Sequence, residues 1–259
     1  MRSSIYQLKC AILLLLAIIT AVGLYLLPPI PQNPLYHHFA DTRTLLYIPN
    51  AFNVLSNVPF LFIGLIGFRY TITKPTITLS YTLFFIGIFL VSFGSSYYHW
   101  HPDNASLIWD RLPMSIAFMS LFTAIIGERI SHKLAHYLLL PLLLLGMASV
   151  FYWYYTETIG QGDLRFYLFI QFFPMLALPY MLLLFPATYT HINNLWLALI
   201  AYGFAKLAEI GDKLIYHLSD YIISGHSIKH LLAALSAYFI YRYLRQRRLL
   251  KSTDINRKH

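Results

Sequence analysis

The chain has 259 residues, of which 58% are hydrophobic and only 11% are charged. A soluble domain of this length normally carries about 25% charged residues, so the composition argues against a soluble fold. The one cysteine, Cys10, excludes an internal disulfide and any metal site built from several thiolates. Because the apolar residues come in long blocks, the sequence predicts an all-α, polytopic bundle of transmembrane helices.

Eight apolar segments each have close to the ~20 residues that a helix needs to cross a bilayer. The first follows basic residues, as in a signal peptide, but its apolar run is long and lacks a clear small-x-small cleavage site. We therefore predict that it is retained as a helix. The segments cover residues 10–27, 52–70, 78–99, 107–127, 137–155, 164–186, 194–214 and 226–244.

The charged residues predict the orientation of these segments, because basic residues collect on the cytoplasmic side of a membrane. Eight crossings place both termini in the cytoplasm and most acidic loop residues on the opposite side. We interpret the basic C-terminal cluster as an anchor to anionic lipid headgroups, since nothing beside it is typical of nucleic-acid binding. The cluster consists of Arg242, Arg245, Arg247, Arg248, Lys251, Arg257 and Lys258.

Titratable side chains from three of these helices are expected at one membrane depth, on the non-cytoplasmic side. His99 ends the third segment, Asp110 lies near the start of the fourth, and His226 and His230 begin the eighth. His226 and His230 are four residues apart, as are Ser95 and His99, so each pair shares a helix face. Ionisable groups inside a membrane usually mark function. Three histidines plus an open position are typical of catalytic zinc, although copper, nickel or iron remain possible from the ligands alone.

Each of these residues also has a purely structural interpretation. The two histidines of the eighth segment can simply form hydrogen bonds, Ser95 can be a small residue at a helix contact, and Asp110 can pair with Arg111. His101 is an alternative to His99 as a ligand. Five further histidines are interpreted as loop residues or as residues on the cytoplasmic side: His37, His38, His132, His136 and His191.

Four stretches of the sequence resemble the alkaline ceramidase family. They are SSYYH at residues 95–99, Asp110 eleven residues after that histidine, SGHSIKH at residues 224–230 and NVLSNVPF at residues 53–60. The family belongs to the CREST superfamily of membrane hydrolases, which also holds the adiponectin-receptor-like proteins. The resemblance spans residues 40–245, and its spacing favours His99 over His101.

The resemblance implies a zinc ion held by His99, His226 and His230, with Ser95 and Asp110 beside it. It also implies a seven-helix CREST-like core plus one extra N-terminal helix. The domain prediction is therefore an N-terminal transmembrane helix at 1–30, the ceramidase-like membrane domain at 40–245 and a basic cytoplasmic tail at 246–259. The resemblance departs at Asn50, where eukaryotic members carry a calcium-binding glutamate, and this argues against calcium and weakens the case for ceramide.

The preferred hypothesis is an enzyme that cleaves the amide bond of a ceramide-like sphingolipid in a membrane. Asp110 would take a proton from water and pass it to the leaving amine, and Ser95 would bind the oxyanion or orient the water. One alternative is an adiponectin-receptor-like receptor or scaffold with a structural zinc site. Another is a transporter, which rests on Lys206, Glu209, Asp212 and Lys213, although these residues have the spacing of ion pairs within a helix. The implied partner is a membrane lipid, and the sequence identifies no protein partner.

Overall fold

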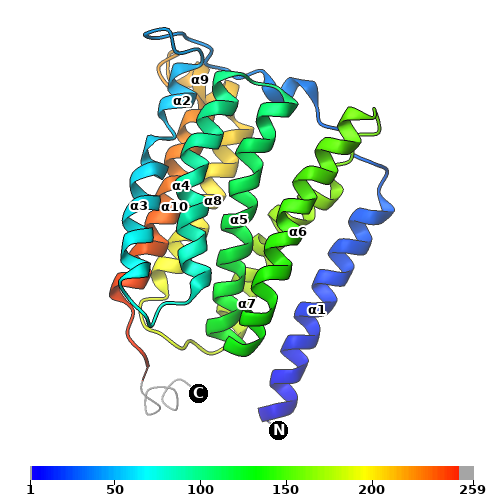
Figure 1. Ribbon diagram of the computed structural model, residues 1–259, viewed down its shortest axis with the longest axis vertical. Coiled ribbons are helices and arrows are strands. Elements are labelled where there is room, and N and C mark those ends of the chain that lie inside the picture. The colour runs from blue at the N-terminus through cyan, green and yellow to red at the C-terminus, as the bar shows by residue number, and fades with distance from the viewer. Residues whose placement is uncertain (1, 251–259) are drawn as a thin grey trace. The chain divides into compact units, whose positions relative to one another are not determined.

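The computed structural model describes residues 2–250, and within them the chain is all-helical apart from turns, loops and two isolated β-bridges (Figure 1). These residues form two compact units. The first comprises residues 2–32, 118–190 and 248–250, and the second comprises residues 33–117 and 191–247. The prediction of an all-α fold is confirmed.

The first unit contains three long helices and the second half of a fourth. The N-terminal helix α1 packs along α7, where the Lys9 ammonium donates to the carbonyl oxygen of Leu184 at 2.6 Å. α6 also packs against α7. The elements of this unit are α1 (Arg2–Leu26), the later part of α5 (Asn104–Arg129), α6 (His132–Thr158) and α7 (Arg165–Leu184).

The second unit is a bundle in which α3 packs against α4, and α10 packs against both α8 and α3 (Figure 1). All five predicted site residues lie in this unit. Its elements are the 3₁₀-helix η1 (Pro34–His37), α2 (Ala51–Leu55), α3 (Val58–Ile72), α4 (Leu79–Trp100), the first part of α5, α8 (Asn193–Ile210), α9 (Asp212–Leu218) and α10 (Gly225–Gln246).

Every predicted apolar segment coincides with long helical structure in the described residues. Six of the resulting spans are long and apolar enough to cross a membrane, which supports a multi-pass membrane protein. α8 and α10 correspond to the other two segments and carry more polar and charged side chains. The predicted domain boundaries and membrane orientation stay predictions, and the basic residues Lys251, Arg257 and Lys258 lie outside the described residues.

Two predicted segments are interrupted where the sequence pattern is continuous. Residues 52–70 divide into α2 and α3 at Ser56 and Asn57, because these side chains bond to nearby main-chain oxygens: Ser56 Oγ to Asn53 O and Asn57 Nδ2 to Asn53 O. The segment at 194–214 ends earlier than predicted, because α8 stops at Ile210 and the short α9 starts after Gly211. Both interruptions place side chains close to the predicted site.

Candidate metal centre

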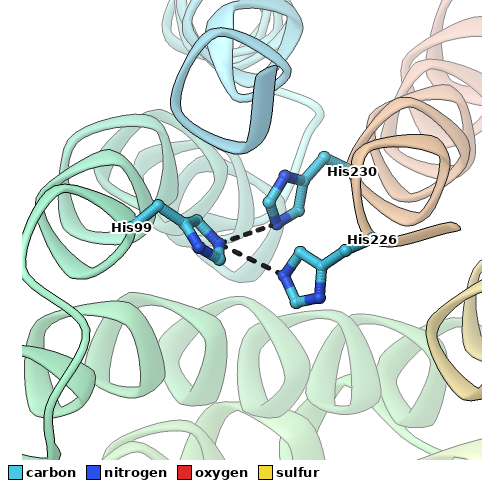
Figure 2. Close-up of side chains that lie close together, drawn as sticks. All are labelled: His99, His226 and His230. Atoms are coloured by element: carbon cyan, nitrogen blue, oxygen red, sulfur yellow. Dashed lines mark hydrogen bonds between the residues drawn. The ribbon is translucent and has the colours of Figure 1, made fainter. Parts of the chain in front are cut away.

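Three histidine side chains from two helices point toward one another in the second unit (Figure 2). His99 comes from the last turn of α4, and His226 and His230 come from the first turns of α10. The Nε2 atom of His99 lies 3.2 Å from Nε2 of His230 and 3.3 Å from Nε2 of His226. All three residues are buried, and one ligand atom from each lies within 4.8 Å of the other two.

This spacing fits a shared metal ion. A tetrahedral ion with metal–nitrogen bonds of about 2.0–2.1 Å holds its ligand nitrogens about 3.3 Å apart. Hydrogen bonding alone does not account for the cluster, because an imidazole nitrogen either donates one proton or accepts through one lone pair, whereas Nε2 of His99 faces two nitrogens. Buried, neutral imidazoles also suit zinc and other borderline transition metals better than calcium. The donor set therefore fits a transition metal without identifying which one.

A serine fixes the orientation of one imidazole. Ser56 lies where α2 ends, and its hydroxyl donates to the carbonyl oxygen of Asn53 at 3.0 Å. The same oxygen lies 2.7 Å from Nδ1 of His230. With the hydroxyl proton directed at Asn53, Nδ1 of His230 can donate to Ser56 Oγ, and this tautomer leaves Nε2 unprotonated and able to bind a metal. Ser56 belongs to the NVLSNVPF stretch at residues 53–60 that resembles the alkaline ceramidase family, but the sequence alone indicated no role for it.

The start of α10 is held by side chains from other elements. The buried Asn53 amide oxygen accepts from the hydroxyl of Ser227 at 2.9 Å, and Asp212 Oδ1 accepts from the backbone N–H of His226 at 2.8 Å. A Cβ added at Gly225 would collide with the carbonyl oxygen of Ala208, so the backbones of α8 and α10 meet here. These contacts fix the helix turn that presents both histidines.

His99 is positioned by contacts at its backbone and its ring. The Asn50 side chain donates to the carbonyl oxygen of His99 at 2.8 Å, across to the end of α4. The Phe39 ring packs against the rings of His99 and His226, with centroids 4.6 and 4.9 Å apart. A glutamate at position 50 accepts hydrogen bonds when ionised and would lose this contact. Asn50 therefore has a structural function in this chain.

Ser95 and Asp110 form a buried pair in the same unit. Ser95 lies beside the Asp110 carboxyl group, within hydrogen-bonding reach, and the two residues are 2% and 4% exposed. A Cβ at Gly94 would collide with the carbonyl oxygen of Trp109, so the backbones of α4 and α5 are in contact at this point. Close helix contact thus brings a serine and an aspartate from neighbouring helices together.

A network of charged side chains adjoins the histidines, and the sequence predicted only part of it. Lys206 and Glu209 form the predicted ion pair within α8. The second partner of Glu209 is Lys229 of α10, whose Nζ lies 2.7 Å from Glu209 Oε1. Lys213, which has the spacing of an ion pair with Glu209 in the sequence, is instead exposed on α9. Burial and the neighbouring Glu209 charge raise the pKa of Tyr36, whose hydroxyl lies 3.5 Å from Glu209 Oε1. Lys229 was missed because its partner lies on another helix.

The other histidines lie apart from the three-histidine cluster. His101 follows α4, is exposed and is not part of the group. His37 belongs to η1, and its ring nitrogens lie 3.0 Å from Tyr98 Oη and from Asn104 Oδ1, so it is more ordered than a simple loop residue. His38 follows η1 and is exposed. Four more histidines of the described residues are exposed: His132, His136, His191 and His217.

Asp41, the acidic residue upstream of Asn50, is already paired. Asp41 Oδ2 lies 2.6 Å from an Arg43 side-chain nitrogen, and Oδ1 accepts from Arg43 Nε at 2.9 Å. Both carboxylate oxygens therefore contact one guanidinium. With Asn50 bound to the His99 carbonyl, this region offers a cation few free acidic oxygens.

Comparison with known proteins gives one family. A family model described as Ceramidase matches residues 41–258, which is most of the chain and includes all five predicted site residues. No curated protein matches the chain significantly. The match begins after α1 and its following linker.

Proposed function

Because this chain belongs to the Ceramidase family, we propose that it hydrolyses the amide bond of a ceramide-like sphingolipid, releasing a fatty acid and a sphingoid base. The observation that carries the proposal is the meeting of three buried imidazole nitrogens from α4 and α10. The Ser95–Asp110 pair adds an acid–base group from α4 and α5. A receptor or scaffold with a structural zinc site would need the three histidines but not an acid–base group beside them.

We assign the metal to zinc, held by His99, His226 and His230. When bound, zinc supplies Lewis acidity, which polarises a carbonyl and lowers the pKa of water from about 16 to about 7. Asp110 accepts a proton from the attacking water as the water oxygen bonds to the amide carbon. When the C–N bond breaks, Asp110 returns that proton to the leaving nitrogen. Ser95 holds the carboxylate in place through its hydrogen bond.

The site belongs to the end of the second unit at which α4 stops and α10 begins. In the predicted orientation this end faces the non-cytoplasmic side of the cell membrane and both termini are cytoplasmic. A lipid entering from that leaflet would bring an amide near its headgroup to the depth of the histidines. In the proposed domain organisation, the extra N-terminal helix, 1–30, precedes the catalytic domain, 40–245.

The experiment that tests this function uses the full chain purified in detergent. Bound metal and fatty-acid release from ceramide are measured for the wild type and for His226→Ala, with His101→Ala as the matched control outside the cluster. We expect stoichiometric zinc and hydrolysis in the wild type and in His101→Ala, and loss of both in His226→Ala. Wild-type protein that binds zinc but cleaves no lipid amide would instead favour the receptor or scaffold.

A further inference from the structure

Lys229 occupies an unusual position for a charged side chain. It lies between His226 and His230 on α10, and its side chain is only 13% exposed. Its ammonium nitrogen lies 2.7 Å from Glu209 Oε1 and 3.5 Å from Nε2 of His226. The ion pair with Glu209 keeps the cation charged and aimed at the histidine cluster. A helix residue that served only to pair with α8 would not have to approach the ring nitrogens.

The contact between Lys229 and His226 changes when a metal is present. The lone pair on Nε2 of His226 cannot accept from an ammonium and bind a metal at the same time. Metal binding therefore releases one N–H of Lys229 beside the metal, while Glu209 still holds another. The ammonium has three N–H groups, so a donor remains available for an oxygen atom of a bound lipid.

Two other donors near the histidines, Ser95 and Lys206, already have partners. Ser95 has a single hydroxyl proton, and while that proton is directed at the adjacent Asp110 carboxylate it cannot also stabilise an oxyanion. Lys206 is held by Glu209 on the α8 side of the network. The chemistry of amide hydrolysis requires a donor where negative charge develops on the carbonyl oxygen.

We propose that Lys229 contacts the substrate by donating a hydrogen bond to its amide carbonyl oxygen, and this inference rests on the proposed hydrolase function. As the water oxygen bonds to the carbonyl carbon, the C=O π electrons move onto the carbonyl oxygen, and Lys229 stabilises that charge. The C=O bond re-forms as the C–N bond breaks. Lys229 retains its protons throughout, since the water proton travels through Asp110. Glu209 is the positioning residue that holds the ammonium.

The proposal has a consequence that separates it from a structural role. A fixed positive charge beside the histidines repels a divalent cation, so Lys229 weakens metal binding while it assists hydrolysis. Removing the charge should change the two quantities in opposite directions. A lysine needed only to hold α10 against α8 would, when removed, loosen the histidines and lower both.

The test compares Lys229→Met with wild type and with Lys213→Met, which removes an exposed lysine of α9. Zinc affinity of the apoprotein is measured by chelator competition. The values of kcat and KM are measured with ceramide as substrate, and folding is checked by thermal unfolding. We expect Lys229→Met to bind zinc several-fold more tightly and to lose about 10²–10³-fold in kcat, with little change in KM. Lys213→Met should match the wild type.

A second variant keeps the test valid if Lys229→Met is unstable. Lys229→Gln removes the charge but retains a neutral N–H donor, so we expect tighter zinc binding with a smaller loss of kcat. Unchanged kcat, or zinc affinity that falls together with kcat, overturns the role of Lys229. Both results leave the hydrolase function standing, whereas absence of ceramide cleavage by zinc-loaded wild type would overturn both.

Discussion

The hydroxyl of Ser56 links the break between α2 and α3 to the imidazole of His230. It donates to Asn53 O at 3.0 Å, and its oxygen lies within hydrogen-bonding distance of Nδ1 of His230, at 2.7 Å. A hydrogen bond to the outer nitrogen fixes the tautomer and the ring orientation of a metal ligand. The helix interruption is therefore part of the candidate metal centre.

Removal of this hydroxyl should weaken metal binding without removing a ligand. We expect Ser56→Ala to lower zinc affinity about 10–100-fold, as is typical for the partner of a metal-binding histidine. Ser56→Thr retains the hydroxyl and serves as the control. Equal zinc affinity in Ser56→Ala and wild type, measured by chelator competition, would show that His230 needs no such partner.

The acid–base group should be separable from metal binding. We expect Asp110→Asn to retain zinc and to lose about 10²–10⁴-fold in kcat, because an amide cannot accept the water proton. Ser95→Ala should lose less kcat than Asp110→Asn, since it leaves the Asp110 carboxylate in place and only removes the hydroxyl beside it. The measurement pairs metal analysis with fatty-acid release, and activity that survives in Asp110→Asn would assign the proton transfer to another residue.

Calcium should have no influence on this chain. Both carboxylate oxygens of Asp41 contact Arg43, and Asn50 donates to the backbone of His99. We expect hydrolysis to be equal with added calcium and with a calcium-selective chelator. A calcium requirement in the wild type would contradict the assignment. Arg43→Ala frees the Asp41 carboxylate, so a calcium requirement that appears only in this variant would be consistent with it.

The N-terminal helix should depend on one ion pair for its attachment within the first unit. Arg165 pairs with Asp163 at 2.7 Å and donates to the carbonyl oxygen of Tyr25 at 2.9 Å. We expect Arg165→Ala to increase protease cleavage between α1 and η1, with Lys133→Ala, an exposed residue of α6, as control. Equal cleavage in the variant and the wild type would mean that the other contacts of α1, including the Lys9–Leu184 hydrogen bond, hold the helix without Arg165.

The same ion pair predicts a pH dependence. The hydrogen bond from Arg165 lowers the pKa of Asp163 to about 2, although burial of the carboxylate acts in the opposite direction. Because the folded pKa lies below the usual aspartate value of about 3.9, the stabilisation is complete above pH ~4 and is lost as pH falls toward about 2. Thermal unfolding of wild type and Asp163→Asn should therefore converge at low pH.

The sequence predicts the helices well because each is marked by its own long apolar run. It also predicts that His99, His226 and His230 share a membrane depth, because four-residue spacing and helix ends are local properties. The contact of Lys229 with Glu209 is different, since it depends on how α8 and α10 rotate against each other. The role of Ser56 likewise depends on a helix break that hydrophobicity does not reveal, and the Ser95–Asp110 pair needs the backbone contact at Gly94.

The most direct test of the central claim is the metal content and coordination of the purified full-length chain. X-ray absorption spectroscopy should find one zinc ion per chain with three imidazole nitrogens at about 2.0–2.1 Å, and His99→Ala, His226→Ala and His230→Ala should each lose it. Wild-type protein without stoichiometric metal, or metal that is unchanged in all three variants, would contradict the account.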